Sequence, residues 1–333
     1  FIILQLLSAQ GKLNSTTRGF LVPACAYIVL AVSLNLLVGI CGELSLGHAG
    51  FMGIGAFTGI IVTSLLAGAV PNGVLRLVIG MIVGGVLAGL VGFVIGIPVL
   101  RLRGDYLAIV TLAFGEIIRN VLNCVYVSND AGQLYFGFNN PSLPGKLIVN
   151  GPQGAQGLTR ISTFTMGFCL IMFTLIVVLN LINSRSGRAM MALRDNRIAA
   201  ESVGISVTKY KLMAFVTSAV FAGVAGVLYA LNYSSLVAKK FDYNTSILIL
   251  VFVVLGGIGS LRGSVIAATV LTVLPELLRS MNDYRMLIYA IVLIVVMIFN
   301  QSPQMIALRK RLTARFRKEG TDTKAAKEKK GVA

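Results

Sequence analysis

Long apolar runs separated by short polar segments make up most of the chain. A helix needs about 20 residues to cross the hydrocarbon core of a bilayer. The runs are continuous and do not alternate, so they predict helices and not the strands of a membrane barrel. Ten candidate spans follow: residues 1–10 (partial), 19–41, 48–69, 75–99, 106–127, 161–183, 212–231, 246–257, 263–279 and 285–301. We predict an all-α, polytopic transmembrane bundle of about ten spans, with some broken or short helices.

Basic residues in the connecting segments predict the orientation. Residues 184–211 carry six Lys/Arg against two acids, and residues 309–333 carry ten against three. Cytoplasmic loops are enriched in Lys and Arg. We therefore expect a membrane domain over 1–308, with a cytoplasmic loop at 184–211 and an external loop at 128–160, followed by a basic cytoplasmic tail at 309–333. An even number of spans puts both termini in the cytoplasm.

Composition agrees with a membrane protein. The 333 residues are 56% hydrophobic and 12% charged, about half the charged fraction of soluble domains. The net charge of +17 is concentrated between the apolar runs and in the tail, where anionic lipid headgroups attract it. We expect contact with membrane lipid and no binding of nucleic acid.

The sequence offers no catalytic or metal chemistry. The four cysteines lie in or beside apolar runs, without paired spacing or histidine neighbours, so they predict neither disulfides nor a metal site. No Gly-x-x-x-x-Gly-Lys-[Ser/Thr] phosphate loop and no nucleophile elbow occurs. We expect no catalytic residue, no metal and no cofactor on this chain.

Two glycine-rich segments predict interrupted helices. Gly42–Leu46 and Gly257–Leu261 share the pattern Gly-x-x-Ser-Leu, one in each half of the chain. Many transporters consist of repeats with helices broken at corresponding positions, although chance in a glycine-rich chain explains the pattern equally well. Two roles stay open for Gly53, Gly55, Gly256, Gly257, Gly259 and Gly263: close helix packing, or breaks whose backbone groups bind a zwitterionic substrate.

Polar residues inside the spans are the other candidates. Glu116 and Arg119 are three residues apart and lie on one side of a helix. They form either an anchoring ion pair or part of a translocation path. His48, the only histidine, stands at the expected cytoplasmic start of a span, near Glu43 and Ser45. We interpret it as a structural hydrogen-bonding residue, with a role in lining or gating the path as the alternative.

The segment Ser184–Lys211 carries charges too often to span, but it is rich in helix formers and has a stop at Gly204. It predicts a short helix on the cytoplasmic face. One interpretation is an ordinary amphipathic surface helix. The other is a docking element, because Ala199-Ala200 followed after three residues by Gly204 matches the loop by which ABC importer permeases engage their ATPases. Small residues there allow close approach.

Four stretches together resemble one family. They are Leu34–Gly39 leading to Gly42–Ala56, Arg103–Arg119, Gly187–Gly204 and Phe241–Gly263. In order and spacing they cover about residues 30–280, and they resemble the permease of branched-chain amino acid ABC transporters, of the LivM type and related to LivH. Two features depart from the family: Arg197-Ile198 stands where an acid often precedes the Ala-Ala pair, and only Asn150–Gly154 represents an external Gly-Gly-Pro-Asn-Gly-like stretch.

The resemblance implies a permease subunit of an ATP-driven importer in the bacterial inner membrane. Its partners would be a second, different permease chain, two cytoplasmic ATPase subunits and an external solute-binding protein. The carried-over coupling residues are Gly187, Arg188, Arg194, Asp195, Ala199, Ala200 and Gly204. Possible path-lining or structural polar residues are Asn35, Glu43, Ser45, His48, Thr111, Glu116, Arg119, Gly256, Gly257 and Gly259. Similar permeases carry urea and short amides, and an ion-coupled secondary transporter is the alternative.

Overall fold

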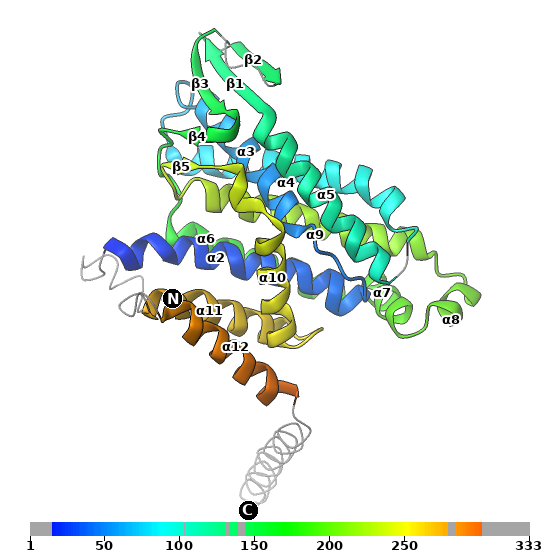
Figure 1. Ribbon diagram of the computed structural model, residues 1–333. Helices are drawn as coiled ribbons and strands as arrows, with labels where there is room; N and C mark the ends of the chain where they lie inside the picture. The colour runs from blue at the N-terminus through cyan, green and yellow to red at the C-terminus, as the bar shows by residue number, and fades with distance from the viewer. Residues whose placement is uncertain (1–14, 103, 131–132, 139–143, 279–283, 302–333) are drawn as a thin grey trace, which may run out of the picture. The chain divides into compact units, whose positions relative to one another are not determined.

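The computed structural model describes residues 15–102, 104–130, 133–138, 144–278 and 284–301. The chain divides into two compact units, Phe1–Val273 and Leu274–Ala333. The first unit contains the helices and strands that follow, up to α10 and most of α11, whose last residues, Leu274–Leu277, belong to the second unit (Figure 1). The expected partial span 1–10, Arg103 and the basic tail 309–333 lie outside the described residues.

Six helices in the described part of the chain are long and apolar enough to cross a membrane. They are α2 (Ser15–Asn35) with its continuation η1 (Leu36–Cys41), α3 (His48–Leu65), α4 (Gly73–Val99), α5 (Asp105–Cys124), α6 (Phe164–Asn183) and α9 (Val207–Ala230). These match six of the predicted spans within a few residues at each end.

The prediction of about ten spans is not confirmed. Three further predicted segments are helical but short: α10 (Tyr243–Gly256), α11 (Leu261–Leu277) and, in the second unit, α12 (Arg285–Gln301). A helix rises 1.5 Å per residue, so the 14 residues of α10 reach about 21 Å, less than the hydrocarbon thickness. The breaks that the sequence predicts around Gly257 are the reason for this shortening.

The all-α prediction is wrong at one end of the bundle. Much of the expected external loop 128–160 folds into strands β1 (Val125–Asp130), β2 (Gln133–Phe138), β3 (Lys146–Asn150) and β4 (Ala155–Gln156), joined by β5 (Ser235–Leu236). A short 3-10 turn, η2 (Gly151–Gln153), precedes β4. The pairs are antiparallel in the order β2-β1-β3-β4-β5. β-branched and aromatic residues favour pairing, so β1 replaces the end of the predicted span 106–127.

The sheet and a pair of short helices lie at opposite ends of the bundle. α9 shows this directly: it follows α7 (Arg185–Asp195) and α8 (Arg197–Ser202), and it leads to β5 and then to η3 (Ala238–Phe241). Successive long helices run in alternating directions between these two ends (Figure 1).

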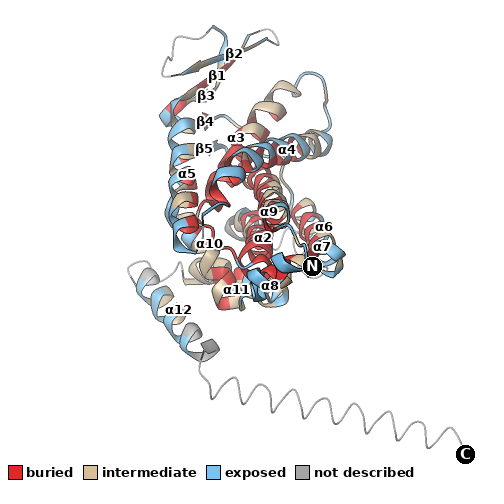
Figure 2. Ribbon diagram, turned by 90° about the vertical axis from the view of Figure 1, so that its right-hand side faces the viewer, coloured by how far each residue is buried: buried red, intermediate tan, exposed pale blue. Residues whose placement is uncertain are grey.

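Burial is concentrated in α2, α3 and α9, with the other helices around them (Figure 2). In the most apolar window of each helix, 94% of the α2–η1 residues are buried, against 22% for α5. The outer faces of α4 and α6 expose apolar side chains: Ile82, Val83, Val86, Leu87, Leu90, Phe93, Val94, Ile97, Met172, Phe173, Ile176 and Leu179. Such faces suit lipid as the surrounding solvent.

Small residues bring the central helices into backbone contact. A Cβ atom on Gly226 of α9 would collide with the Met52 carbonyl of α3, and one on Gly55 of α3 would collide with the Gly223 carbonyl of α9. The prediction of close packing is therefore correct for Gly55, as expected for glycines between membrane helices.

We expect the change Gly226→Ala to destabilise the protein, because the added methyl group must push α3 and α9 apart. Overpacking of this kind costs about 1–3 kcal/mol, which thermal unfolding in detergent will detect as a lower midpoint. Gly68→Ala is the control, since no atom lies within 4 Å of the new methyl group. Equal midpoints for the two variants would contradict the close approach.

Candidate functional site

The segment predicted as one short cytoplasmic helix folds as two helices, α7 and α8. Asn196 between them is extended, and its side chain accepts a hydrogen bond from the Ala199 N–H at 3.1 Å. Asn is a preferred N-cap residue, so it ends α7 and starts α8. The predicted stop at Gly204 is confirmed, because its φ is +83°.

The predicted Ala199-Ala200 pair is divided between two environments. Ala200 is buried in a small apolar cluster with α7 and α9, whereas Ala199 is exposed. Bulk at Ala200 would therefore disturb this cluster and not a partner surface. The large apolar side chains that α8 presents outward are Ile198, 80% exposed, and Val203, 75% exposed. Neither residue was predicted from the sequence as a site residue. The available signal was the presence of two apolar residues among the charges of an extramembrane segment.

Two of the predicted coupling residues make local contacts at the start of α7. The Gly187 N–H donates to Ser184 Oγ at 3.2 Å. A side chain on Gly187 would collide with carbonyls in the last turn of α6, so glycine permits the tight turn. Arg188 Nη1 donates to the Asn183 carbonyl at 3.1 Å. Both contacts stay within the α6–α7 connection.

Two helices end where the Gly-x-x-Ser-Leu segments predict breaks. The π-helical turn η1 ends at Gly42, with φ of +77°, and α10 ends before Gly257, with φ of +94°. Gly259 follows with φ of +84°. The two breaks are in backbone contact, because a Cβ atom on Gly39 would collide with the Gly259 nitrogen. We call this contact between Gly39 and Gly259 the break junction.

Asn35 holds the break junction together. The side chain is fully buried. Its Oδ1 accepts from the Gly259 N–H at 2.9 Å, and its Nδ2 donates to Ser264 Oγ at 2.8 Å. Both ends of the carboxamide are thus satisfied across more than 220 residues of sequence, as a buried polar group requires.

Arg194 attaches α7 to the same place. Its Nη1 donates to the Gly39 carbonyl at 2.8 Å, while Nε and Nη2 donate to Asp195 Oδ1 at 3.0 and 2.9 Å. The aliphatic part of Arg194 lies against Gly42, where a Cβ atom would be 2.7 Å from Cγ. Of the predicted coupling residues, Arg194 is the one that the structure brings to the break junction.

Glu43, directly after the first break, forms an ion pair with Lys211. Both are buried, with exposed fractions of 9% and 5%. Lys211 was expected in the cytoplasmic loop, because the span was predicted to begin at residue 212. α9 begins instead at Val207, so Lys211 lies in its second turn. Nearby, the Ser45 hydroxyl is buried without a hydrogen-bond partner among the described residues.

His48 starts α3 inside the bundle, and not at its cytoplasmic end as expected. Its Nε2 is 2.8 Å from Ser33 Oγ, and the Ser33 carbonyl accepts from Ser218 at the middle of α9. Because the Ser33 hydroxyl donates to Leu30 O, His48 Nε2–H is the donor in this arrangement. This agrees with the hydrogen-bonding interpretation.

Hydroxyl groups satisfy the N–H groups around the start of α3. The Leu46 N–H donates to Thr111 Oγ1 at 3.0 Å, and the Ala49 N–H donates to Ser246 Oγ at 3.0 Å. A helix start has N–H groups without partners in its own helix. The predicted residue Thr111 therefore has a structural role, in holding a helix end that lies within the membrane domain.

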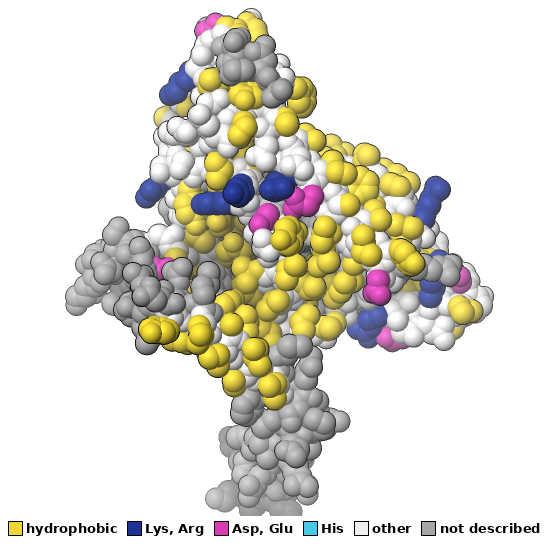
Figure 3. Space-filling model, viewed as in Figure 1, with side chains coloured by type: hydrophobic (Ala, Val, Ile, Leu, Met, Phe, Trp, Pro, Cys, Tyr) yellow, Lys and Arg dark blue, Asp and Glu magenta, His cyan; other side chains and the backbone are white. Residues whose placement is uncertain are grey.

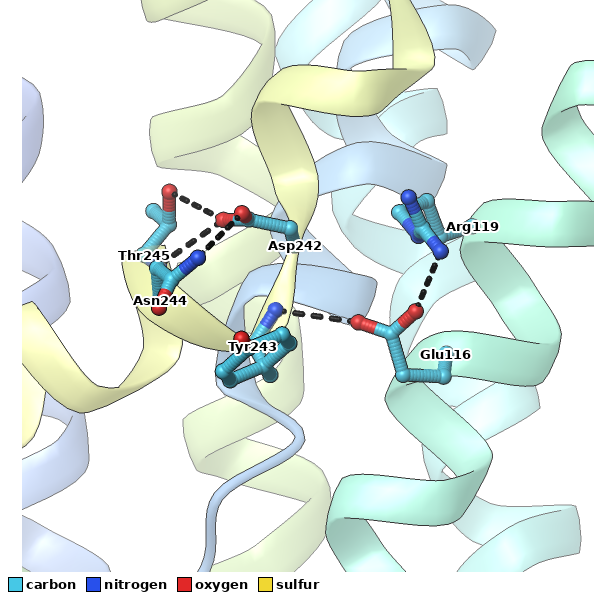
Figure 4. Close-up of polar contacts among 6 residues, drawn as sticks. All are labelled: Glu116, Arg119, Asp242, Tyr243, Asn244 and Thr245. Atoms are coloured by element: carbon cyan, nitrogen blue, oxygen red, sulfur yellow. Dashed lines mark hydrogen bonds and ion pairs between the residues drawn. The ribbon is translucent and has the colours of Figure 1, made fainter.

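Glu116 and Arg119 lie apart from the break junction, and Glu116 faces the start of α10. Arg119 Nη2 is 2.6 Å from Glu116 Oε2, and Glu116 Oε1 accepts from the Tyr243 N–H at 3.0 Å (Figure 4). Asp242 beside them caps α10 through the Thr245 N–H. Each side chain of the Glu116–Arg119 pair is 24% exposed, and Arg119 Nε is buried without a partner among the described residues.

A pocket of about 390 Å³ lies at the sheet end of the bundle. The last turn of α3, with strands β3 and β4, lines it, and Thr63, Ser64, Lys146 and Gln156 supply polar atoms. None of the predicted site residues borders this pocket.

The apolar helices and the buried polar contacts between them define a multi-pass α-helical membrane protein. Residues 16–297 match the family of branched-chain amino acid transport system permease components, and the chain belongs to this family. No solved structure matches it significantly.

Relatives agree with this assignment. The chain is 33% identical over 317 residues to the high-affinity branched-chain amino acid transport system permease protein LivM of Salmonella typhimurium, across 82% of this chain and 66% of the relative. LivM of Escherichia coli gives the same identity and coverage. The chain thus spans slightly less than two thirds of these relatives. The ribose import permease protein RbsC of Escherichia coli is 24% identical, across 84% of this chain and 74% of the relative.

We predict that removing one partner of the Glu43–Lys211 pair lowers stability strongly. Glu43→Gln or Lys211→Met leaves an uncompensated buried charge, which costs about 3–5 kcal/mol, and replacing both residues by methionine costs less than the sum. Thermal unfolding in detergent measures each variant. Glu201→Gln, which opens the exposed Arg197–Glu201 pair, is the control and should change little. Additive single effects would show that the two charges do not interact.

Proposed function

We propose that this chain is a membrane-spanning permease subunit of an ATP-driven ABC importer that moves branched-chain or related amino acids. Family membership supports this proposal, as do the relatives named for branched-chain amino acid transport. The chain would act with a second permease chain, two cytoplasmic ATPase subunits and an external solute-binding protein. ATP would be hydrolysed on the ATPase subunits.

The observation that carries the proposal is the form of α7 and α8. They are rich in charge, so they lie outside the membrane. They pack on the start of α9 through Ala200 and its apolar neighbours, and they leave Ile198 and Val203 exposed. An apolar pair on an otherwise polar end is typical of a protein contact. In the bacterial inner membrane, the end of the bundle with α7 and α8 would face the cytoplasm, and both termini would lie on that side.

The translocation path would run along α5 and the start of α10. The outer faces of α4 and α6 expose large apolar residues, and α5 also exposes Ile109, Ile117 and Val121. Beside them, α5 carries the partly exposed Glu116–Arg119 pair. Figure 3 shows charged side chains gathered in the middle of an apolar face. Charges facing lipid are costly, so protein or water would cover this face, as between two permease chains around a path.

Exposed apolar residues of α8 provide the test of ATPase docking. Ile198→Asp and Val203→Asp should lower the amount of ATPase subunit that co-purifies with the permease by at least tenfold, because a buried unpaired carboxylate is unfavourable at an interface. Glu201→Gln, on the same helix and also exposed, should leave it unchanged. Uptake that survives ATP depletion and collapses with an ion gradient would instead support a secondary transporter.

The charged pair on α5 gives a second test. Glu116→Gln keeps an oxygen for the Tyr243 N–H and removes the charge. If the pair lines the path, amino-acid uptake by the assembled complex should fall about tenfold, with unchanged assembly and unfolding temperature. Ile117→Ala, at an exposed neighbouring position, is the control. A lower unfolding temperature with normal uptake per folded complex would identify a structural pair.

A further inference from the structure

Arg194 is the next-to-last residue of α7, and its side chain donates a hydrogen bond to a different helical element, η1. The Gly39 carbonyl that it meets belongs to the last turn of η1. Carbonyls in the last turn of a helix have no following N–H within that helix. The two N–H groups just beyond η1, those of Gly42 and Glu43, both turn back to the Leu37 carbonyl. The guanidinium therefore caps the C-terminal end of the first described span, where a positive charge is also favourable.

The orientation of Arg194 is set from both sides. Asp195 accepts two of its N–H groups, so the guanidinium fork is held with Nη1 toward the Gly39 carbonyl. Gly42 leaves room for the aliphatic chain, since a Cβ atom there would be 2.7 Å from Arg194 Cγ. Arg194 Nη1 also lies 3.8 Å from the Cβ position of Gly259. One guanidinium is thus hydrogen-bonded to one side of the break junction and lies near the other.

We propose that Arg194 is the positioning residue that transmits a displacement of α7–α8 to the break junction. This rests on the proposed function, in which the ATPase subunits move α7–α8. A shift of α7 pulls on the Gly39 carbonyl, and Gly39 cannot slide past Gly259 without separating the two backbones, because they are already in contact. Asn35 joins η1 to Gly259 and to Ser264 of α11, so the motion reaches α10 and α11 together.

We expect this motion to reach the N-terminal end of α10 as well. α10 is a single helix of 14 residues, and the N–H of its first residue, Tyr243, is hydrogen-bonded to Glu116 of α5. A rigid helix moved at Gly256 also moves at Tyr243. The displacement therefore changes the contact between α10 and the charged Glu116–Arg119 pair of α5, where the proposed path lies.

The test uses the complete complex of permeases, ATPase subunits and binding protein in lipid vesicles. Arg194→Ala should keep the ATPase subunits bound and ATP hydrolysis within about twofold, while uptake falls about tenfold, so that more ATP is spent per solute. Arg194→Lys, which retains the charge and one donor toward Gly39, should recover part of the uptake. Arg185→Ala is the matched control, since that arginine is exposed at the opposite end of the same helix.

A second measurement does not depend on uptake. Hydrogen–deuterium exchange of residues 36–42 should be faster in Arg194→Ala than in the unaltered complex, and unchanged in Arg185→Ala, because only the first variant removes the cap of η1. Unchanged exchange together with an unchanged ATP-to-solute ratio would overturn the proposal. Loss of ATPase binding in Arg194→Ala, to the extent seen with Ile198→Asp, would overturn it as well and assign Arg194 to docking. An unaltered chain that binds no ATPase subunit would instead overturn the proposed function itself.

Discussion

Buried polar groups in this protein must find hydrogen-bond partners inside the chain. The Asn35 carboxamide meets this requirement at the contact between the two helix breaks. Water is absent from the hydrocarbon core, so every interrupted helix must have its free backbone groups satisfied by protein. Asn35 accepts the Gly259 N–H and donates to Ser264, which joins two interrupted helices. Without this bridge, the contact between Gly39 and Gly259 would leave the partly buried Gly259 N–H without this acceptor.

The same requirement explains two contacts of charged residues near the α7–α8 end of the bundle. Arg194 satisfies a carbonyl of η1 from outside the membrane domain, and Lys211 neutralises Glu43 just past the break. Each contact ties an extramembrane or interfacial segment to a helix end. Under the proposed function, such ties would let a movement of α7 and α8 reach the broken helices.

The sequence predicts the helical part of the fold well, and for a simple reason. Continuous apolar runs of about 20 residues have one stable form in lipid, so the six long helices lie close to their predicted bounds. The prediction was wrong where the local sequence is compatible with both a helix and a strand. The apolar residues Val125–Val127 were predicted to end a span, but Val125–Asp130 pairs as a strand in a sheet completed by Ser235–Leu236 from far along the chain. The predicted spans outside the described residues stay predictions.

For the site, the sequence by itself determined which residues interrupt helices: Gly42 and Gly257 have positive φ because no side chain obstructs that conformation. It also determined that the segment around Arg194 is too charged to span. Only the tertiary structure decided which groups meet. Glu43 pairs with Lys211, and Ala200 faces inward while Ile198 faces outward, because partner choice depends on how helices distant in sequence pack. A linear pattern carries no information about those distances.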